Sequence, residues 1–390
     1  VVAAGLCALA AQNGWQAAFM APTEILAAQH AETLAPMLDK LGISCTLLTG
    51  SMTAAQKRAA LAAIETGAAQ VVVGTHALIQ QGVQFHRLGA VIADEQHRFG
   101  VAQRAALSAK GGSPHVLVMS ATPIPRTLAL IMYGDLDVSV LDELPPGRQK
   151  VDTFLVGESY RARINAFIRK QAEAGHQCFV VCPAVEENQE LDVKAAAAWA
   201  ETLQKTVFPD LRVALLHGQM KSAEKEEAMA SFARGEADVL VATTVIEVGV
   251  DVPNATVMVI ENAERFGLSA LHQLRGRVGR GAANSCCILI SDNEGEAVRQ
   301  RLHFLCRTSD GFAVAKYDLE TRGPGDFFGE AQHGLPTLHV ADLVQDTRTL
   351  TVAQQEAKAL LALDPNLAKP EHKALSDEVE RLFATAGAMN

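Results

Sequence analysis

Two adjacent carboxylates follow a strongly apolar run in the first half of the chain. The run Ala90–Ala93 leads directly into Asp94-Glu95-Gln96-His97. Such a run predicts a buried strand, and ligands of open parallel sheets gather beyond the carboxyl ends of the strands. At that place one carboxylate can hold Mg²⁺ while the second orients and deprotonates the water that attacks a phosphate. The same residues also fit an ordinary acidic helix start, because Asp94 is a good N-cap.

A set of arginines in the second half could complete such chemistry. The segment is Gln273-Leu274-Arg275-Gly276-Arg277-Val278-Gly279-Arg280-Gly281. Arg277 and Arg280 are three residues apart, so on a helix they would project from one face. Two guanidinium groups there could contact a γ-phosphate and neutralise transition-state charge. Gly276 and Gly279 are costly in a free helix, which favours a close approach over a solvated basic surface helix.

Two hydroxyl-bearing segments follow other apolar runs. Ser120-Ala121-Thr122 could contact the acidic pair, although it also fits a capped helix start before Pro123. The segment Thr243–Asp251 supplies hydroxyls, Gly249 and the Asp251 carboxylate. It could serve a nucleotide and a backbone phosphate, or it could be an ordinary turn between a strand and a helix.

Short runs rich in Val, Ile and Leu recur through the chain and alternate with amphipathic segments such as 54–65 and 222–233. The eleven runs are 17–22, 45–50, 70–75, 90–95, 115–122, 151–156, 177–183, 212–218, 238–243, 256–262 and 286–291. Runs that are apolar on both faces predict parallel strands covered by helices on both sides. The alternation therefore predicts a doubly wound α/β architecture.

The alternation breaks at Leu144-Pro145-Pro146-Gly147-Arg148, where two prolines cannot continue a helix or a central strand. We therefore predict two α/β lobes, residues 1–144 and 151–292, joined by a hinge over 145–150. After Ser291 no further strand is predicted, so residues 293–390 are expected to be mainly helical.

Composition narrows the class of protein. The 390 residues carry a net charge of −10, so any contact with nucleic acid must come from a local groove and not from bulk basicity. No apolar run approaches the roughly 20 residues that span a bilayer. The 7 cysteines are scattered without a CxxC pair, which argues against a disulfide framework or a zinc ribbon and favours the reducing cytosol.

The order of these segments resembles the motor of superfamily 2 helicases, and most closely the bacterial RecG family. The segments resemble motifs Ia, Ib, II, III, IV, V and VI at residues 21–24, 74–76, 94–97, 120–122, 217–218, 242–251 and 273–280. This joint order is far more specific than any single motif. The resemblance implies two tandem RecA-like parallel-sheet lobes followed by the helical C-terminal region.

A C-terminal block narrows the resemblance. Residues 318–329, with Gln332-His333-Gly334, resemble the translocation motif shared by RecG and the transcription-repair coupling factor Mfd. The segment PGDFFG and the hinge DELPPGR are more similar to RecG than to Mfd. Without the resemblance, Arg322 beside Gly323-Pro324 would fit an ordinary turn with a solvated cation.

The resemblance implies a role for each candidate residue. Asp94 would hold Mg²⁺ through a water molecule, Glu95 would be the general base, and Arg280 would be the arginine finger. The residues implied to bind ATP with them or to couple its hydrolysis are Gln273, Arg277, His97, Ser120, Thr122, Gly249 and Asp251. Contacts with DNA phosphates are implied for Thr23, Thr75 and Thr243, and coupling of lobe closure to duplex tracking for Arg322 and Gln332.

The implied function is that of an ATP-dependent DNA helicase or translocase in the cytoplasm. It would remodel stalled forks and branch-migrate Holliday junctions in recombination and repair, using ATP and Mg²⁺. Its partners would be branched or double-stranded DNA and a single-strand-binding protein. Three alternatives stay open: an Mfd-like translocase, an RNA helicase and a non-catalytic nucleic-acid-binding remnant.

The phosphate loop of the family, G-x-x-x-x-G-K-[ST], does not occur, since no glycine of the chain is followed by lysine. The wedge region with which RecG proteins engage branched DNA is not recognised either. The start without Met favours a fragment of a longer reading frame over a natural remnant. We therefore expect no ATP hydrolysis by this chain alone.

Overall fold

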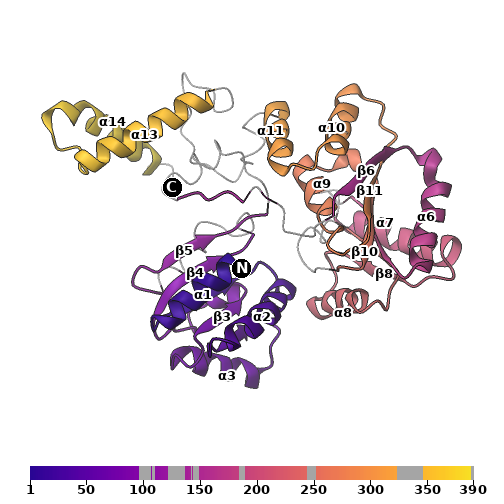
Figure 1. Ribbon diagram of the computed structural model, residues 1–390, viewed down its shortest axis with the longest axis horizontal. Coiled ribbons are helices and arrows are strands. Elements are labelled where there is room, and N and C mark those ends of the chain that lie inside the picture. Colours follow the sequence, from indigo (N-terminus) through magenta and orange to yellow (C-terminus); the bar gives the residue numbers. More distant parts are fainter. Residues whose placement is uncertain are drawn as a thin grey trace. The chain divides into compact units, whose positions relative to one another are not determined.

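The computed structural model describes residues 1–95, 107, 110–121, 137–141, 143, 149–183, 189–243, 252–322 and 346–387. The chain divides into two compact units, residues 1–122 with 144–309 and residues 123–143 with 310–390. The first unit contains two parallel sheets, here called sheet A and sheet B (Figure 1). No helix among the described residues is long and apolar enough to span a bilayer.

Sheet A has five strands, all parallel. Their order across the sheet is β2 (Cys45–Leu48), β3 (Val71–Gly74), β1 (Gln16–Met20), β4 (Leu88–Ala93) and β5 (His115–Val118). The strand β1 is buried along its whole length, because both of its faces are covered by helices. Its register places Phe19 beside Ile92 and Met20 beside Ala93, so β1 and β4 end at the same edge.

Helices cover the two faces of sheet A because alternate side chains of each strand point in opposite directions. The helices α1 (Val2–Gln12) and α2 (Glu24–Asp39) pack with Phe19 and Ile92 on one face. The helix α3 (Ala54–Glu65) packs with Met20 on the other. This is the doubly wound arrangement that the apolar runs predict.

Sheet B has six parallel strands. Their order is β6 (Val151–Val156), β11 (Ser285–Ile290), β10 (Ala255–Ile260), β7 (Gln177–Val181), β9 (Val239–Ala242) and β8 (Val213–Leu216). One face is covered by α6 (Arg161–Glu173) and by α7 (Gln189–Thr202) with the π-helical turn η4 (Leu203–Val207). On the other face lies α8 (Ser222–Ala233), whose Phe232 ring contacts Phe179 of β7 at 4.9 Å between centroids. The helices α9 (Leu268–Arg275) and α10 (Glu296–Arg307) flank β11 in sequence.

All eleven predicted strands are present, and the α/β class is confirmed. The predicted runs extend past several observed strand ends, as for 177–183 against β7, which ends at Val181. The N–H of Cys182 still donates to the carbonyl of Ala242 at 2.8 Å, so the backbone pairing continues one residue past the end of β7.

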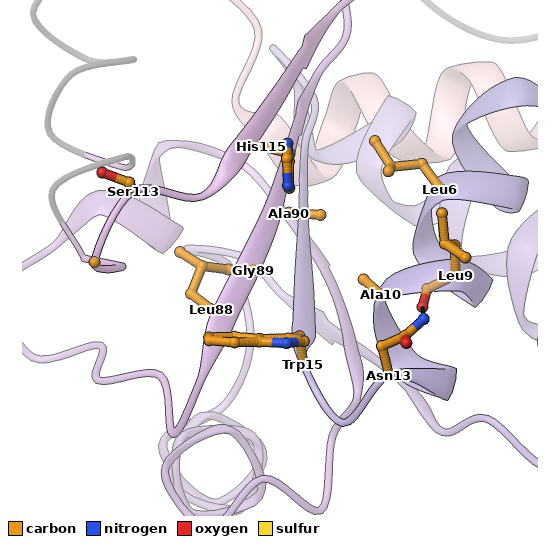
Figure 2. Close-up of a pocket in the computed structure, with 11 residues that line it drawn as sticks. Leu6, Leu9, Ala10, Asn13, Trp15, Leu88, Gly89, Ala90, Ser113 and His115 are labelled. Carbon is orange, nitrogen blue, oxygen red and sulfur yellow. Dashed lines mark hydrogen bonds between the residues drawn. The ribbon is translucent and has the colours of Figure 1, made fainter.

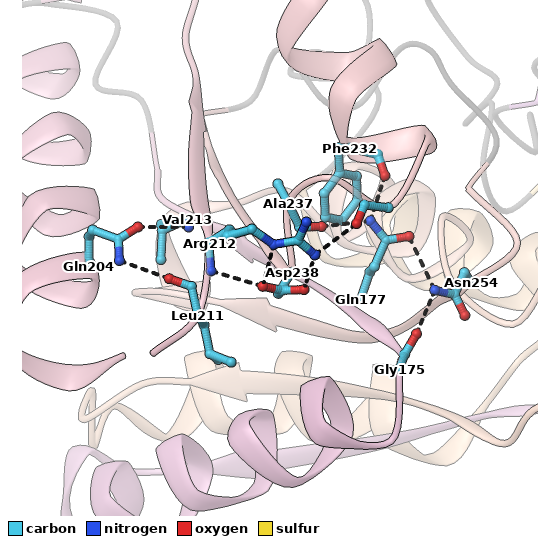
Figure 3. Close-up of polar contacts among 11 residues, drawn as sticks. Gly175, Gln177, Gln204, Leu211, Arg212, Val213, Phe232, Ala237, Asp238 and Asn254 are labelled. Atoms are coloured by element: carbon cyan, nitrogen blue, oxygen red, sulfur yellow. Dashed lines mark hydrogen bonds and ion pairs between the residues drawn. The ribbon is translucent and has the colours of Figure 1, made fainter. Parts of the chain in front are cut away.

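The two sheets share one internal design. The side-chain amide of Gln16, at the start of β1, donates to the carbonyl of Ile64 at the end of α3 at 2.9 Å and to that of Ala69 before β3 at 2.7 Å. Gln177 starts β7 and donates in the same way to the carbonyls of Phe232 and Ala237, before β9 (Figure 3). Both amides are buried, so each satisfies carbonyls that water cannot reach.

The described helices of the second unit are α11 (Gly311–Arg322), α13 (Thr347–Leu363), the 3-10 turn η7 (Pro370–His372) and α14 (Lys373–Gly387). Asp364 directly follows α13 and forms hydrogen bonds with the segment that leads to α14. Its carboxylate accepts hydrogen bonds from the N–H groups of Ala368 and Lys369, both at 3.0 Å, and from His372 at 2.7 Å. These bonds lower the pKa of Asp364 to about 2.

The substitution Gln16→Leu tests the shared design, because it removes the donor that the buried carbonyls of Ile64 and Ala69 require. We expect it to cost about 1–3 kcal/mol of stability. Hydrogen exchange should accelerate in β1 and β3 while the amides of sheet B keep their protection. The control Gln12→Leu, at an exposed position of α1, should change stability by less than about 0.5 kcal/mol. Equal protection of β3 in the two variants would contradict this role of Gln16.

Candidate functional site

Asp94 and Glu95 lie at the carboxyl edge of sheet A, directly after β4. The backbone N–H of Asp94 donates to the carbonyl of Met20 at 3.0 Å, so the parallel ladder with β1 continues to this residue. The Oδ1 atom of Asp94 accepts from the backbone N–H of Glu95 at 3.0 Å. The carboxylate pair is therefore held by the sheet itself, at the edge where parallel sheets bind ligands.

Glu95 has an unusual backbone conformation. Its φ angle is +51°, in the left-handed region, which costs a non-glycine residue of order 1–3 kcal/mol. Its side chain is also largely buried, with 9% of the residue exposed. Strain of this kind persists only where the surrounding structure enforces it, and it is typical of functional sites.

A histidine that sequence reasoning missed contacts the pair. The Nε2 atom of His30 lies 2.8 Å from Oδ2 of Asp94. His30 lies in α2, where Ala27, Leu34 and Leu38 form the buried face, and its ring packs on Phe19 at 4.6 Å between centroids. The sequence does contain a signal for this role, because His30 interrupts the otherwise apolar stripe of α2.

Three other candidates lie at the same edge of sheet A. Thr23 follows β1 and caps α2, its hydroxyl accepting from the N–H of Leu26 at 3.3 Å. Thr75 directly follows β3, is buried, and caps the 3-10 turn η1 (His76–Ile79). Ser120 lies two residues after β5 and is exposed. The parallel strands thus bring Asp94, Glu95 and these hydroxyl groups to one edge.

The helix α9 carries the start of the arginine segment. Leu268, Leu271 and Leu274 form its buried face, and Gln273 is half-buried. Arg275 is a structural residue, with 5% of its surface exposed. Its guanidinium donates to the carbonyls of Leu305 and Thr308 at the end of α10 and contacts His272, all within 2.8 Å. Burial lowers the pKa of this group.

The prediction that Arg277 and Arg280 project from one helical face is wrong. The helix ends at Arg275, and Gly279 has a φ of +76°, which a continuing helix cannot accommodate. A Cβ atom on Gly279 would lie 2.7 Å from the Val151 side chain, so the predicted close approach does occur, but to the first residue of β6. Arg280 is exposed, and its Nε donates to the carbonyl of Gly276 at 3.2 Å.

Thr243 and the two glycines of the arginine segment lie at different edges of sheet B. Thr243 directly follows β9 and is buried at the carboxyl edge. Gly279 and Gly281 instead pack near the residues that begin β6 and β11 or precede β10. Arg322 is the last residue of α11. His97, Thr122, Gly249, Asp251 and Gln332 lie outside the described residues.

A pocket of about 460 Å³ lies elsewhere in the first lobe. It opens between α1 and the starting ends of β4 and β5, with Leu6 and Leu9 on one side and Trp15 and His115 on the other (Figure 2). Asp94 is at the opposite end of β4. The pocket contains no candidate residue, so we do not assign it to the acidic pair.

The acidic pair would suit a magnesium ion that takes only one or two of its ligands from the protein. Within the described residues, no cluster of three His, Cys, Asp or Glu side chains could hold a metal. Two carboxylates alone match Mg²⁺, which proteins bind through one or two carboxylates together with waters and substrate phosphates.

Three family models match the chain in succession. Residues 2–131 match the DEAD/DEAH box helicase domain, and residues 160–282 match the helicase conserved C-terminal domain. Residues 308–386 match the C-terminal part of domain 3 of the ATP-dependent DNA helicase RecG.

Similar proteins of known identity agree with these models. An ATP-dependent DNA helicase RecG of Synechocystis is 52% identical over 365 residues, covering 93% of this chain and 44% of that protein. That of Bacillus subtilis is 48% identical over 367 residues, covering 94% of this chain and 54% of the relative. The chain thus spans about half the length of the curated relatives it matches.

Solved structures show the same relationship. A structure of RecG bound to a three-way DNA junction superposes with a TM-score of 0.70 at 48% identity, covering 86% of this chain and 44% of that one. Yeast Dbp5 bound to RNA, at 15% identity and a TM-score of 0.54, covers 88% of this chain and 81% of its own, and it shares the fold alone. The chain therefore belongs to the RecG family of superfamily 2 helicases.

Proposed function

We propose that this chain is the motor of an ATP-dependent DNA helicase or translocase that remodels branched DNA in recombination and repair. Its substrates are stalled forks and Holliday junctions, its cofactors are ATP and Mg²⁺, and it works in the cytoplasm, where a single-strand-binding protein is a partner. The observation that supports this most is the 52% identity to a RecG helicase across 93% of the chain. In this chain, Asp94 and Glu95 directly follow the interior strand β4.

In the first lobe, Asp94 would hold Mg²⁺ through water and Glu95 would accept the proton of the attacking water. The ion, when bound, neutralises charge on the phosphates. Both oxygens of Asp94 already accept a hydrogen bond, one from Glu95 and one from His30, and each keeps a lone pair that can accept from a water on the ion. The surrounding structure buries Glu95 and enforces its backbone conformation, so its carboxylate has a defined position, as a general base requires.

In the second lobe, Arg280 is the arginine finger and Arg277 and Gln273 assist it at the phosphates. Arg280 is exposed, so its guanidinium can reach a ligand. Arg275 does not contact the nucleotide, because its donors hold the end of α10. Its role is to fix the loop on which the other two arginines stand.

DNA is bound through its phosphates, by Thr23, Thr75, Thr243 and the nearby backbone. Thr75 and Thr243 are buried, so backbone N–H groups beside them make part of these contacts. Ser120, Thr122, His97, Gly249 and Asp251 couple the nucleotide to the DNA, while Arg322 and Gln332 couple it to duplex tracking. Binding is therefore salt-dependent and largely independent of sequence.

An Mfd-like translocase is the second candidate. The match of residues 308–386 to RecG domain 3 favours the RecG type. A non-catalytic remnant differs in that its DNA binding would not respond to ATP. The chimera below distinguishes our proposal from the non-catalytic remnant.

The first test joins the chain to the segment that precedes the matched region in the Thermotoga maritima relative, which is 50% identical over 349 residues. We expect DNA-stimulated ATP hydrolysis that Glu95→Gln lowers by at least about 10²-fold in kcat, because the base is lost. ATP binding, measured by fluorescence of a nucleotide analogue, should stay unchanged.

The control is Glu65→Gln, at the exposed end of α3, which should keep the activity of the chimera. Hydrolysis that Glu95→Gln leaves intact would refute the assigned base.

The second test is Arg280→Ala in the same chimera. We expect kcat to fall about 10³-fold, since an arginine finger stabilises charge that develops in the transition state. The KM for ATP should change much less. Arg163→Ala, at an exposed position of α6, is the matched control. A loss confined to KM would show that Arg280 binds the ground state and is not a finger.

A further inference from the structure

We propose that His30 is a positioning residue for Asp94: its imidazole fixes the carboxylate in the orientation that accepts a hydrated divalent cation. The inference deepens the proposed function, because it depends on Asp94 being the residue that holds the metal. Histidine and carboxylate pairs of this kind occur around many metal sites, where the partner orients the residue that meets the ion.

Asp94 is restrained from three directions. Its N–H is bonded to Met20 of β1, its Oδ1 accepts from Glu95, and its Oδ2 lies 2.8 Å from Nε2 of His30. A carboxylate only accepts hydrogen bonds, so Nε2 of His30 is the donor in this pair. Two of the contacts come from the backbone, and His30 is the side chain that sets the direction of Oδ2.

The imidazole is itself held in place. Its ring contacts the Phe19 ring at 4.6 Å between centroids, with the two planes at 46°. Phe19 belongs to β1 and is 2% exposed, so it cannot move without disturbing the sheet. The position of His30 is thus defined by α2 on one side and by β1 on the other.

The pair does little for the stability of the fold. The side chains of His30 and Asp94 are 27% and 21% exposed, so water could solvate Asp94 if His30 were absent. An ion pair that water can reach contributes little to stability. Because no buried charge requires neutralisation, orientation of the carboxylate explains the contact better than stability.

The corresponding position of sheet B shows the contrast. Glu261 directly follows β10, and its N–H donates to Val181 of β7 just as that of Asp94 donates to Met20. Glu261 is 8% exposed, and both of its oxygens accept from Arg161 at 2.6 Å. This guanidinium fork neutralises the carboxylate. His30 in contrast contacts one oxygen of Asp94 and leaves its remaining lone pairs for water.

The test uses Mn²⁺ as a paramagnetic probe of the 390-residue chain. Nuclear magnetic resonance would follow broadening of the Ala93 and Glu95 amide signals as Mn²⁺ is added. His30→Phe keeps a ring beside Phe19 but has no donor, whereas His30→Gln keeps an N–H donor at the end of its side chain. Asp94→Ala removes the carboxylate itself, and thermal unfolding reports whether each variant is folded.

We expect His30→Phe to raise the Mn²⁺ concentration for half-maximal broadening about tenfold at an unchanged melting temperature. His30→Gln should stay near the wild-type value, and Asp94→Ala should abolish the effect. If Asp94→Ala abolishes broadening but His30→Phe changes nothing, the role of His30 is overturned while that of Asp94 stands. Equal losses in both His30 variants with lower melting temperatures would show a structural role and overturn it too. If the wild-type chain shows no broadening, or Asp94→Ala retains it, the metal role of Asp94 fails and the inference with it.

Discussion

The parallel register of β1 and β4 is the constraint on which the candidate site depends. Because Phe19 pairs with Ile92 and Met20 with Ala93, both strands end together, and the N–H of Asp94 still finds a carbonyl partner on β1. The neighbouring strands end at the same edge, so residues distant in sequence meet there. A slip of one residue would turn the side chains of β4 to the opposite face and separate Asp94 from His30.

The two lobes share the same internal hydrogen bonds but differ in the partner of one acidic residue. Each sheet begins a central strand with a buried glutamine that satisfies the carbonyls of a distant turn, at Gln16 and at Gln177. In each sheet an acidic residue directly follows a strand that neighbours this one: Asp94 follows β4, and Glu261 follows β10. In sheet A that residue is only partly exposed and contacts a histidine, whereas in sheet B Arg161 neutralises Glu261. Of these two carboxylates, the one in sheet B is paired with a guanidinium and the one in sheet A with an imidazole.

The sequence predicted the sheets well because a strand that is buried on both faces must be a continuous apolar run, and such runs can be read directly. Prediction from the sequence failed where a contact with a residue distant in the chain is part of the local structure. The turn at Gly279 depends on Val151, which is distant in sequence, so helical spacing misplaced Arg277 and Arg280. His30 was missed for a similar reason, since its partner Asp94 is adjacent only in the folded chain. The likeness of the two lobes is also present in the sequence, in the similar segments LLTGSM at 47–52 and LLHGQM at 215–220.

The central claim is that Asp94 and Glu95 of the first lobe act on the same nucleotide as Arg280 of the second. The most direct measurement is a crystal structure of the protein extended by a phosphate loop, with Mg²⁺, ADP, aluminium fluoride and branched DNA. We predict that a water on the ion contacts Asp94, that Glu95 faces the attacking water and that Arg280 contacts the fluoride. A nucleotide bound away from the end of β4, or Arg280 directed to solvent with DNA and nucleotide both present, would contradict the account.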